Sequence, residues 1–297
     1  MMVLRPAFSR NDKGLAGSFV IRPAALSEMN IILGWASSEG WNPGLADAEP
    51  FHSADPGGFL FGLLDGEPIT CISVVRYGAN YGFLGFYICR PEFRGRGYGW
   101  KTWRAGMNHL AGRTIGLDGV VAQQGNYAKS GFALAHRNIR HGGKAGAPSA
   151  PSPNIRKASP DDTLLKAIFD YDRPFFPAPR KEFLRLWLSP PRRTFVHVKD
   201  GALRGYGTIR ECGEGYKIGP LFADDEGIAA ELFSALRSAV PPAETVFLDV
   251  PEPNEAAQRL ARSAGLTPVF ETARMYRGPA PALPLSRIFG ITTFELG

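Results

Sequence analysis

The chain has 297 residues, a length that predicts two domains, each large enough for its own hydrophobic core. Hydrophobic residues make up 44% and charged residues 21%, as in an ordinary globular protein, and the net charge of +6 is spread along the chain, which argues against a nucleic-acid partner. The three cysteines lack metal-binding or C-x-x-C spacing, so we expect a reducing compartment and no metal. No segment has the length of a membrane span and the N-terminus has no apolar signal core, so we expect a cytoplasmic protein without a membrane partner.

The first elements alternate between strand and helix patterns. Polar residues 1–17 predict a flexible N-terminus, the run from Ser18 to Pro23 predicts a strand, and residues 24–36 have apolar side chains at helical spacing. A loop around Glu39 and Trp41 follows; a large aromatic in a loop either lines a pocket or packs as local core.

A β-hairpin is expected next. Residues 59–64 and 69–77 are rich in apolar and β-branched side chains, and Asp65-Gly66 between them is a strong turn signal. Residues 83–89 continue the pattern with another aromatic strand.

The glycine-rich turn Arg94-Gly95-Arg96-Gly97-Tyr98-Gly99 comes directly after this strand. Alternate glycines allow positive φ angles and leave backbone N–H groups exposed, and a helix expected to begin near Trp100 adds the positive end of its dipole. The turn therefore predicts an anion-binding loop, with a glycine-rich hairpin carrying solvated arginines as the alternative.

The spacing of the turn separates the families that use such loops. Both the dinucleotide pattern G-x-G-x-x-G and the Walker A pattern fail, because Trp100 occupies a required glycine position. The remaining pattern, Arg94, Gly97 and Gly99, resembles the pyrophosphate loop of the GNAT superfamily of N-acetyltransferases. The resemblance implies acetyl-coenzyme A as cosubstrate, bound by the loop and nearby residues: Tyr87, Ile88, Cys89, Arg94, Gly95, Arg96, Gly97, Tyr98, Gly99, Trp100 and Lys129.

The order of the following elements is similar to that of a GNAT domain. Residues 114–120 predict a strand, and residues 123–130 precede Gly131-Phe132. We therefore expect an α/β (α+β) catalytic GNAT domain over residues 18–141, with a mixed, mostly antiparallel sheet flanked by helices.

The second half repeats the first. Residues 142–153, built from Gly, Ala, Ser and Pro apart from Lys144, predict a linker. In residues 154–297 the hairpin recurs, and Leu248-Asp249-Val250 matches Leu117-Asp118-Gly119. At the position that corresponds to the arginines of the glycine-rich turn, the second half has Asp224-Asp225-Glu226. Because acids would repel a pyrophosphate, we expect a degenerate GNAT-like domain that has lost its cosubstrate, with a final strand in the C-terminal tail.

Tyr127 lies in a segment that resembles the family's Tyr-x-Lys-x-Gly-Phe ending, in which the tyrosine protonates the departing thiolate. The alternative is a tyrosine that only closes the pocket wall. The resemblance also implies a backbone N–H near residues 87–89 as oxyanion donor. For the base, the strand offers no acid, so Glu39, Asp47, Asp118 or a water chain could serve, and Glu39 is preferred.

Acetyl transfer to a primary amine of a small molecule is the predicted function, with the second half closing the acceptor pocket. We expect Trp41, Asn42, Asp118 and Phe176 to bind the acceptor. The alternatives are a non-catalytic acyl-coenzyme A sensor and an acetyltransferase acting on protein or peptide amines. Either a monomer or a homodimer is compatible with the sequence.

Overall fold

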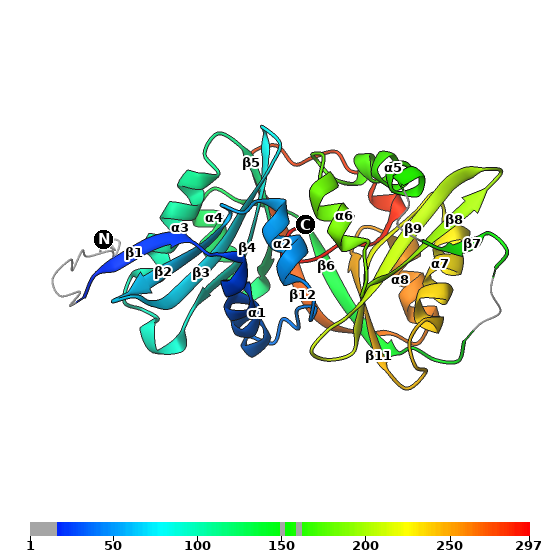
Figure 1. Ribbon diagram of the computed structural model, residues 1–297, viewed down its shortest axis with the longest axis horizontal. Helices are drawn as coiled ribbons and strands as arrows, with labels where there is room; N and C mark the ends of the chain where they lie inside the picture. The colour runs from blue at the N-terminus through cyan, green and yellow to red at the C-terminus, as the bar shows by residue number, and fades with distance from the viewer. Residues whose placement is uncertain (1–16, 149–151, 159–161) are drawn as a thin grey trace, which may run out of the picture.

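The computed structural model describes residues 17–148, 152–158 and 162–297. The predicted flexible N-terminus lies outside the described residues apart from Gly17, as do residues 149–151 of the predicted linker. Two lobes stand side by side and share one continuous sheet (Figure 1). Its strand order is β1-β2-β3-β4-β5-β12-β6-β11-β10-β9-β8-β7, and β13 pairs with β10 off this path.

The first half of the chain supplies β1 to β6 and α1 to α4. Its elements are β1 (Phe19–Pro23), α1 (Met29–Ser38), α2 (Ala48–Ala54), β2 (Phe59–Leu64), β3 (Glu67–Tyr77), β4 (Tyr81–Cys89), α3 (Tyr98–His109), β5 (Thr114–Val120), α4 (Gln124–Lys129) and β6 (Ala133–Lys144).

The second half supplies the remaining elements. They are β7 (Ile155–Lys157), α5 (Asp162–Asp172), α6 (Lys181–Trp187), β8 (Arg193–Lys199), β9 (Ala202–Glu211), β10 (Tyr216–Ala223), α7 (Glu226–Ser238), β11 (Thr245–Pro251), α8 (Glu255–Ser263), β12 (Thr267–Arg277) and β13 (Ile288–Gly290). Among the described strands only β4 with β5 and β10 with β11 pair in parallel, so the predicted mixed, mostly antiparallel sheet is confirmed.

One strand of each half, β6 of the first and β12 of the second, pairs with the sheet of the other half. Strand β6 runs antiparallel to β11, and β12 runs antiparallel to β5. The two exchanged strands also pair with each other in the middle of the sheet. Neither lobe is therefore built from one contiguous stretch of sequence.

This exchange corrects the predicted start of the linker. Residues 142–144 form the end of β6, where Gly142 pairs with both Phe247 and Thr267. A Cβ at Gly142 would lie 2.9 Å from the Phe247 ring, and one at Gly143 would lie 3.0 Å from the Gly265 carbonyl oxygen. These glycines allow close packing between strands. From the sequence alone, the same glycines predict a flexible linker.

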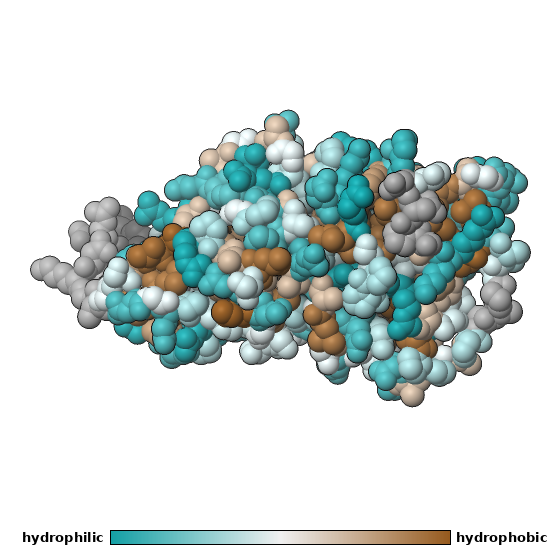
Figure 2. Space-filling view, viewed as in Figure 1, coloured by the Kyte–Doolittle hydropathy of each residue, from teal (hydrophilic) through white to brown (hydrophobic). Residues whose placement is uncertain are grey.

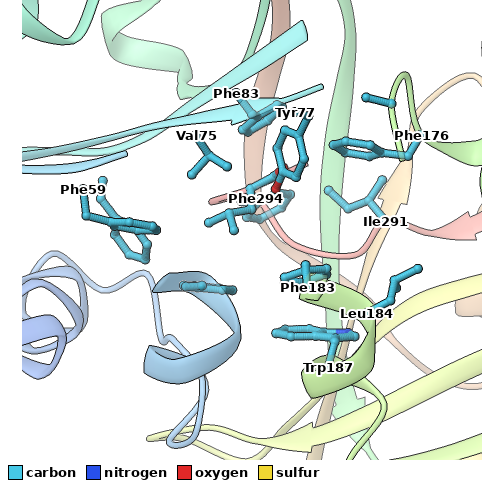
Figure 3. Close-up of a cluster of buried hydrophobic side chains, with 14 of the residues drawn as sticks. Phe59, Val75, Tyr77, Phe83, Phe176, Phe183, Leu184, Trp187, Ile291 and Phe294 are labelled. Atoms are coloured by element: carbon cyan, nitrogen blue, oxygen red, sulfur yellow. The ribbon is translucent and has the colours of Figure 1, made fainter. Parts of the chain in front are cut away.

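A shared hydrophobic core lies on the face of the sheet covered by α1, α2, α5 and α6. Its side chains come from both halves and from the C-terminal tail, as Figure 3 shows for Phe59 and Val75, for Phe183 and Trp187, and for the tail residue Phe294. The Phe51 and Trp187 rings stack across the lobes with centroids 5.9 Å apart. The lobes therefore bury apolar surface against each other.

Two buried ion pairs fix the exchanged strands. Asp118 of β5 accepts hydrogen bonds from Nε and Nη2 of Arg274 of β12 at 3.0 and 2.5 Å. Asp249 of β11 accepts the corresponding bonds from Arg140 of β6 at 2.7 and 2.9 Å. The aspartates occupy the repeated positions found in the sequence, so each half contributes an acid that binds the other half's arginine.

The outer surface carries mixed polarity. On the face shown in Figure 2, hydrophilic residues separate the apolar ones. Among the described residues, no helix combines the length and apolar character needed to cross a membrane.

The Asp118–Arg274 pair predicts a strong dependence of stability on Arg274. The Arg274→Ala substitution leaves the Asp118 carboxylate, whose side chain is 0% exposed, without its cation, and should lower the free energy of unfolding by about 3–5 kcal/mol. Chemical denaturation followed by circular dichroism measures this loss.

Arg137→Ala is the matched control. Arg137 of β6 pairs with Glu271 of β12, also across neighbouring strands, but the side chains are 37% and 43% exposed, so its loss should cost about 0–1 kcal/mol. Equal losses in the two variants would contradict the structural role given to the buried pair.

Candidate active site

A cavity opens where β4 and β5 separate. The two strands pair in parallel only where Tyr81–Leu84 of β4 face Thr114–Leu117 of β5. Beyond these residues they diverge. The space between them is about 540 Å³, partly open to solvent. Its walls include the ends of both strands, α4, β12 and the C-terminal tail; among them are Tyr87, Asp118, Gly119, Tyr127, Thr272 and Glu295.

A bulge in β4 shapes one wall of this cavity. The register between β3 and β4 shifts between Cys71 and Ser73, and Phe86 has a φ of 44°, a left-handed conformation that costs a non-glycine residue energy. Beyond Leu84 the strand has no β5 partner. Residues 84–87 of this strand line the cavity, and Tyr87 is the first residue of the segment where the resemblance implied an oxyanion donor.

The glycine-rich turn lies at the N-terminus of α3. Gly95 and Gly97 have φ angles of 75° and 85°, and a Cβ built on either would meet no atom within 4 Å. The turn thus combines left-handed backbone with open space beside the first N–H groups of a 12-residue helix, the arrangement of an anion site. Gly99 instead faces inward, where a Cβ would lie 3.0 Å from the Tyr87 hydroxyl.

The residues around this turn differ in their exposure. Tyr98 is fully buried and its ring lies 4.9 Å from that of Phe19, so its side chain belongs to the core. Trp100 is 58% exposed on the first turn of α3. Cys89 is half-buried, and burial raises the pKa of its thiol. Lys129 is exposed, and its Nζ donates to Asn126 at 3.3 Å.

Glu39 does not line the cavity, which corrects its predicted position as the base. Its carboxylate forms an ion pair with the Arg94 guanidinium, whose Nε also donates to the Cys89 carbonyl at 2.8 Å. The guanidinium of Arg96 lies over the Phe93 ring at 5.6 Å. Glu39 therefore holds a loop arginine in place at the anion-binding end of the site.

Tyr127 of α4 faces the cavity. A Cβ at Gly119 would come within 2.3 Å of the Tyr127 ring, so only glycine at that position of β5 allows the approach. The ring also stacks on Trp103 of α3, with centroids 5.8 Å apart. Burial raises the pKa of the Tyr127 phenol to about 12.

Of the predicted acceptor residues, Trp41 lies in the cavity wall and Asn42 does not. The Asn42 side chain donates to the Glu214 carbonyl at 2.8 Å and accepts from the Glu214 N–H at 2.9 Å. Asn42 thus joins the two halves through both ends of its side-chain amide.

Asp118 and Phe176 also have structural roles. Asp118 borders the cavity, but its carboxylate is occupied by Arg274 and by the Asn138 amide at 2.7 Å. Phe176 packs against Tyr77 and Tyr81, with ring centroids 4.7 and 5.6 Å away, in a different part of the molecule from this cavity. The structure therefore separates Phe176 from the predicted acceptor site.

The corresponding slot of the second half is filled by the chain itself. Strands β10 and β11 pair in parallel only as far as Ile218 and Leu248, and then β13 pairs with Leu221 and Phe222 of β10. The Ile291 N–H also donates to the Asp249 carbonyl at 2.9 Å. The tail thus occupies the second half's counterpart of the space that remains open between β4 and β5 in the first half.

The helix N-terminus of the second half is also satisfied internally. Asp225 caps α7, accepting a hydrogen bond from the Ile228 N–H at 2.9 Å. A carboxylate of the chain therefore stands where the first half exposes N–H groups to an anion.

The C-terminal tail continues from β13 into the cavity of the first half. Phe294 and Glu295 line its wall, and Tyr77 donates to the Leu296 carbonyl at 3.3 Å. A Cβ at Gly85 would lie 2.3 Å from the Glu295 carbonyl oxygen, so the tail lies directly against the β4 bulge. The predicted final strand exists only as β13, and the contribution of Glu295 to the site was missed because no sequence spacing connects it with β4.

No metal-binding group of three or more His, Cys, Asp or Glu side chains occurs within the part of the chain that the structure describes. The described site is therefore built from backbone, aromatic and carboxylate groups.

Comparison with known proteins agrees with this architecture. A model of the acetyltransferase (GNAT) family matches residues 26–132, and a model of the acetyltransferase (GNAT) domain matches residues 168–290. The chain is 32% identical over 281 residues to holothin acyltransferase from Pseudoalteromonas sp. (strain SANK 73390), covering 93% of this chain and 94% of that protein.

Solved structures show the same fold across the chain. A putative acetyltransferase from Pyrococcus horikoshii matches with a TM-score of 0.79 and 19% identity, covering 98% of this chain and all of that one. A tandem GNAT protein from the clavulanic acid biosynthesis pathway matches with a TM-score of 0.62 and 16% identity, covering 89% and 100%. With two GNAT domains and a full-length acyltransferase relative, the chain belongs to the GNAT family and is a tandem GNAT acyltransferase.

Proposed function

We propose that the first half transfers an acetyl group from acetyl-coenzyme A to the primary amine of a small molecule. The observation that carries this proposal is the open slot between β4 and β5, which has an anion-binding helix N-terminus beside it and Tyr127 within it. The second half lacks both features, since β13 fills its slot and Asp225 caps its helix.

The residues present fit acetyl-coenzyme A. The exposed loop of Gly95 and Gly97, with Arg94 and Arg96 beside it, suits a pyrophosphate, because bare N–H groups, a helix dipole and guanidinium groups all favour anions. The unpaired edge of β4 offers backbone N–H donors to an extended amide-containing arm and to a thioester oxygen.

Tyr127 acts on the departing thiolate in this proposal. A pKa of about 12 lies roughly three and a half units above that of an ordinary thiol, near 8.5, so complete proton transfer from the phenol is uphill by about 5 kcal/mol. Tyr127 therefore stabilises the thiolate chiefly by donating a hydrogen bond, and the carbon–sulfur bond breaks with its electron pair on sulfur.

The acceptor end of the cavity suits a compact, partly apolar amine. Trp41, Phe270 and Phe294 line it, and the tail narrows it from the side of the second half. The Pseudoalteromonas relative is named as an acyltransferase of holothin. Acyl transfer is in keeping with that name, and the second half supplies part of the acceptor wall through Phe270 and the tail.

One coenzyme A should bind per chain. The first half has the open slot and the second half is filled by β13, so we expect a stoichiometry of one in isothermal titration calorimetry. Two equivalent sites per chain would contradict the assignment of the loop.

The Gly97→Val substitution should abolish coenzyme A binding. Valine is strained at a φ of 85° and its side chain would fill the space next to the N–H groups of the loop. Binding is measured by calorimetry, and the expected loss of affinity is about 100-fold or more.

Gly112→Val is the control for this substitution. Gly112 has a φ of 79° and equally open surroundings, but it lies beyond the opposite end of α3. Both variants should lose similar stability, and only Gly97→Val should lose binding. Loss of binding in both variants would show that strain in the helix, and not the loop, governs affinity.

The Tyr127→Phe substitution should lower kcat by about 100-fold while the affinity for coenzyme A changes only a few-fold, because the phenol acts on the leaving thiolate. Steady-state kinetics and calorimetry measure the two effects. Since burial holds the phenol pKa near 12, the neutral donor persists at alkaline pH, and Tyr127 should cause no loss of kcat between about pH 7 and 10.

Two other results would revise the role of Tyr127. An unchanged kcat would reduce it to a wall of the pocket. Tight coenzyme A binding by the wild type, without product from any amine, would favour a sensor of acyl-coenzyme A.

A further inference from the structure

The tail places one acidic residue in the cavity wall that the sequence pattern did not predict there. Glu295 is 5% exposed and lies in the same cavity wall as Trp41 and Phe294, with Tyr127 also lining the cavity. Its backbone is held against Gly85 of the β4 bulge, and its N–H donates to the Thr293 hydroxyl at 3.1 Å. The position of Glu295 is therefore fixed by the packing of the tail.

The Glu295 carboxylate has no direct partner of its own. Among the described residues, neither a hydrogen bond nor an ion pair within 4 Å involves its side-chain oxygens, although buried carboxylates are normally paired. Asp118 and Asp249, at the same depth in the sheet, are each bound by an arginine. Glu295 is thus a buried acid adjoining a cavity, with capacity to accept hydrogen bonds.

Three cationic side chains lie around Glu295. Arg140, Lys217 and Arg210 lie within electrostatic range of it. Arg140 is bound to Asp249 and Arg210 to Asp47, while the Lys217 Nζ donates to the Trp41 carbonyl at 3.0 Å.

Lys217 belongs to the same cluster of charges, and its pKa is shifted in opposite directions by different neighbours. Burial and the neighbouring arginines lower the pKa of Lys217 to about 8, and Glu295 partly opposes this shift. Cys212 lies among the same groups, and burial raises the pKa of its thiol. The cluster therefore places positive charges near Glu295, and none of them forms a salt bridge with it within the described residues.

Resting on the proposed amine acetylation, we propose that Glu295 binds the ammonium group of the acceptor and removes its proton. The Glu295 carboxylate takes one proton from R–NH₃⁺ and later passes it to solvent. The nitrogen lone pair forms the bond to the thioester carbon, and the carbon–sulfur bond breaks with its electrons on sulfur. The second nitrogen proton ends on the thiol, so the products are the amide, coenzyme A and one proton.

This role divides the site by charge. The arginines and the helix N-terminus receive the anionic part of the cosubstrate, whereas Glu295 receives a cationic acceptor at the end closed by the tail. Glu39, the acid preferred on sequence grounds, is paired with Arg94 and is not among the residues that line this cavity.

The test compares Glu295→Gln with wild type on two acceptors of similar shape. Benzylamine is protonated at neutral pH and needs a base, whereas O-benzylhydroxylamine is already neutral there. For benzylamine we expect kcat/KM to fall by about 10²–10⁴-fold, and for O-benzylhydroxylamine by less than about 10-fold. Coenzyme A affinity should stay within a few-fold in the variant.

Glu39→Gln is the control, because it removes an acid of the same type outside the cavity and should lower the rates with both amines by the same factor. Glu295→Asp keeps the charge and should lose less activity with benzylamine than Glu295→Gln. Because each variant is compared with itself on two amines, reduced stability cannot imitate the expected difference. Should either Glu295 variant fail to fold, the other carries the comparison.

Equal losses with the two acceptors, or no loss, would overturn the role of Glu295 and leave the proposed acetyl transfer intact. Absence of wild-type turnover with every amine tried would overturn the proposed function, and the role of Glu295 with it.

Discussion

The reciprocal exchange of β6 and β12 is the constraint on which the rest of the structure depends. Each exchanged strand carries an arginine, and each arginine binds an aspartate of the opposite half in a buried, bidentate pair. Such a pair is costly to break because the remaining charge has no water to solvate it. The two halves therefore cannot separate without exposing both pairs, and the cavity beside β5 keeps a fixed wall supplied by β12.

The exchange also determines where the C-terminal tail can run. After β12 the chain returns through β13 into the slot between β10 and β11, which an acyl donor would need. It then crosses to the bulge of β4. The packing at Gly219 shows how closely it passes, since a Cβ there would lie 2.5 Å from the Thr292 carbonyl oxygen, much as at Gly85 with Glu295. One segment thus fills one slot and borders the other.

Most of the fold could be predicted from local sequence patterns. The hairpin, the glycine-rich turn and the duplication were recognisable because turn chemistry and strand periodicity are local signals, and the two GNAT domains are confirmed. Strand exchange could not be predicted, since β6 and β12 have the same pattern whichever sheet they join. Glu39 and Asp118 were favoured as site acids by their neighbours in sequence, but their ion partners lie far away along the chain.

The asymmetry between the halves follows from the course of the segment after β12. Two equal halves would present two equal slots, but β13 enters only the slot of the second half. Once β13 occupies the second slot, Asp225 can cap α7 without opposing a ligand phosphate, because that slot no longer accepts one. Beyond β13 the same tail packs against Gly85 of β4 and brings Glu295 to the wall of the remaining cavity. Loss of one cosubstrate slot and completion of the other are therefore consequences of the same segment.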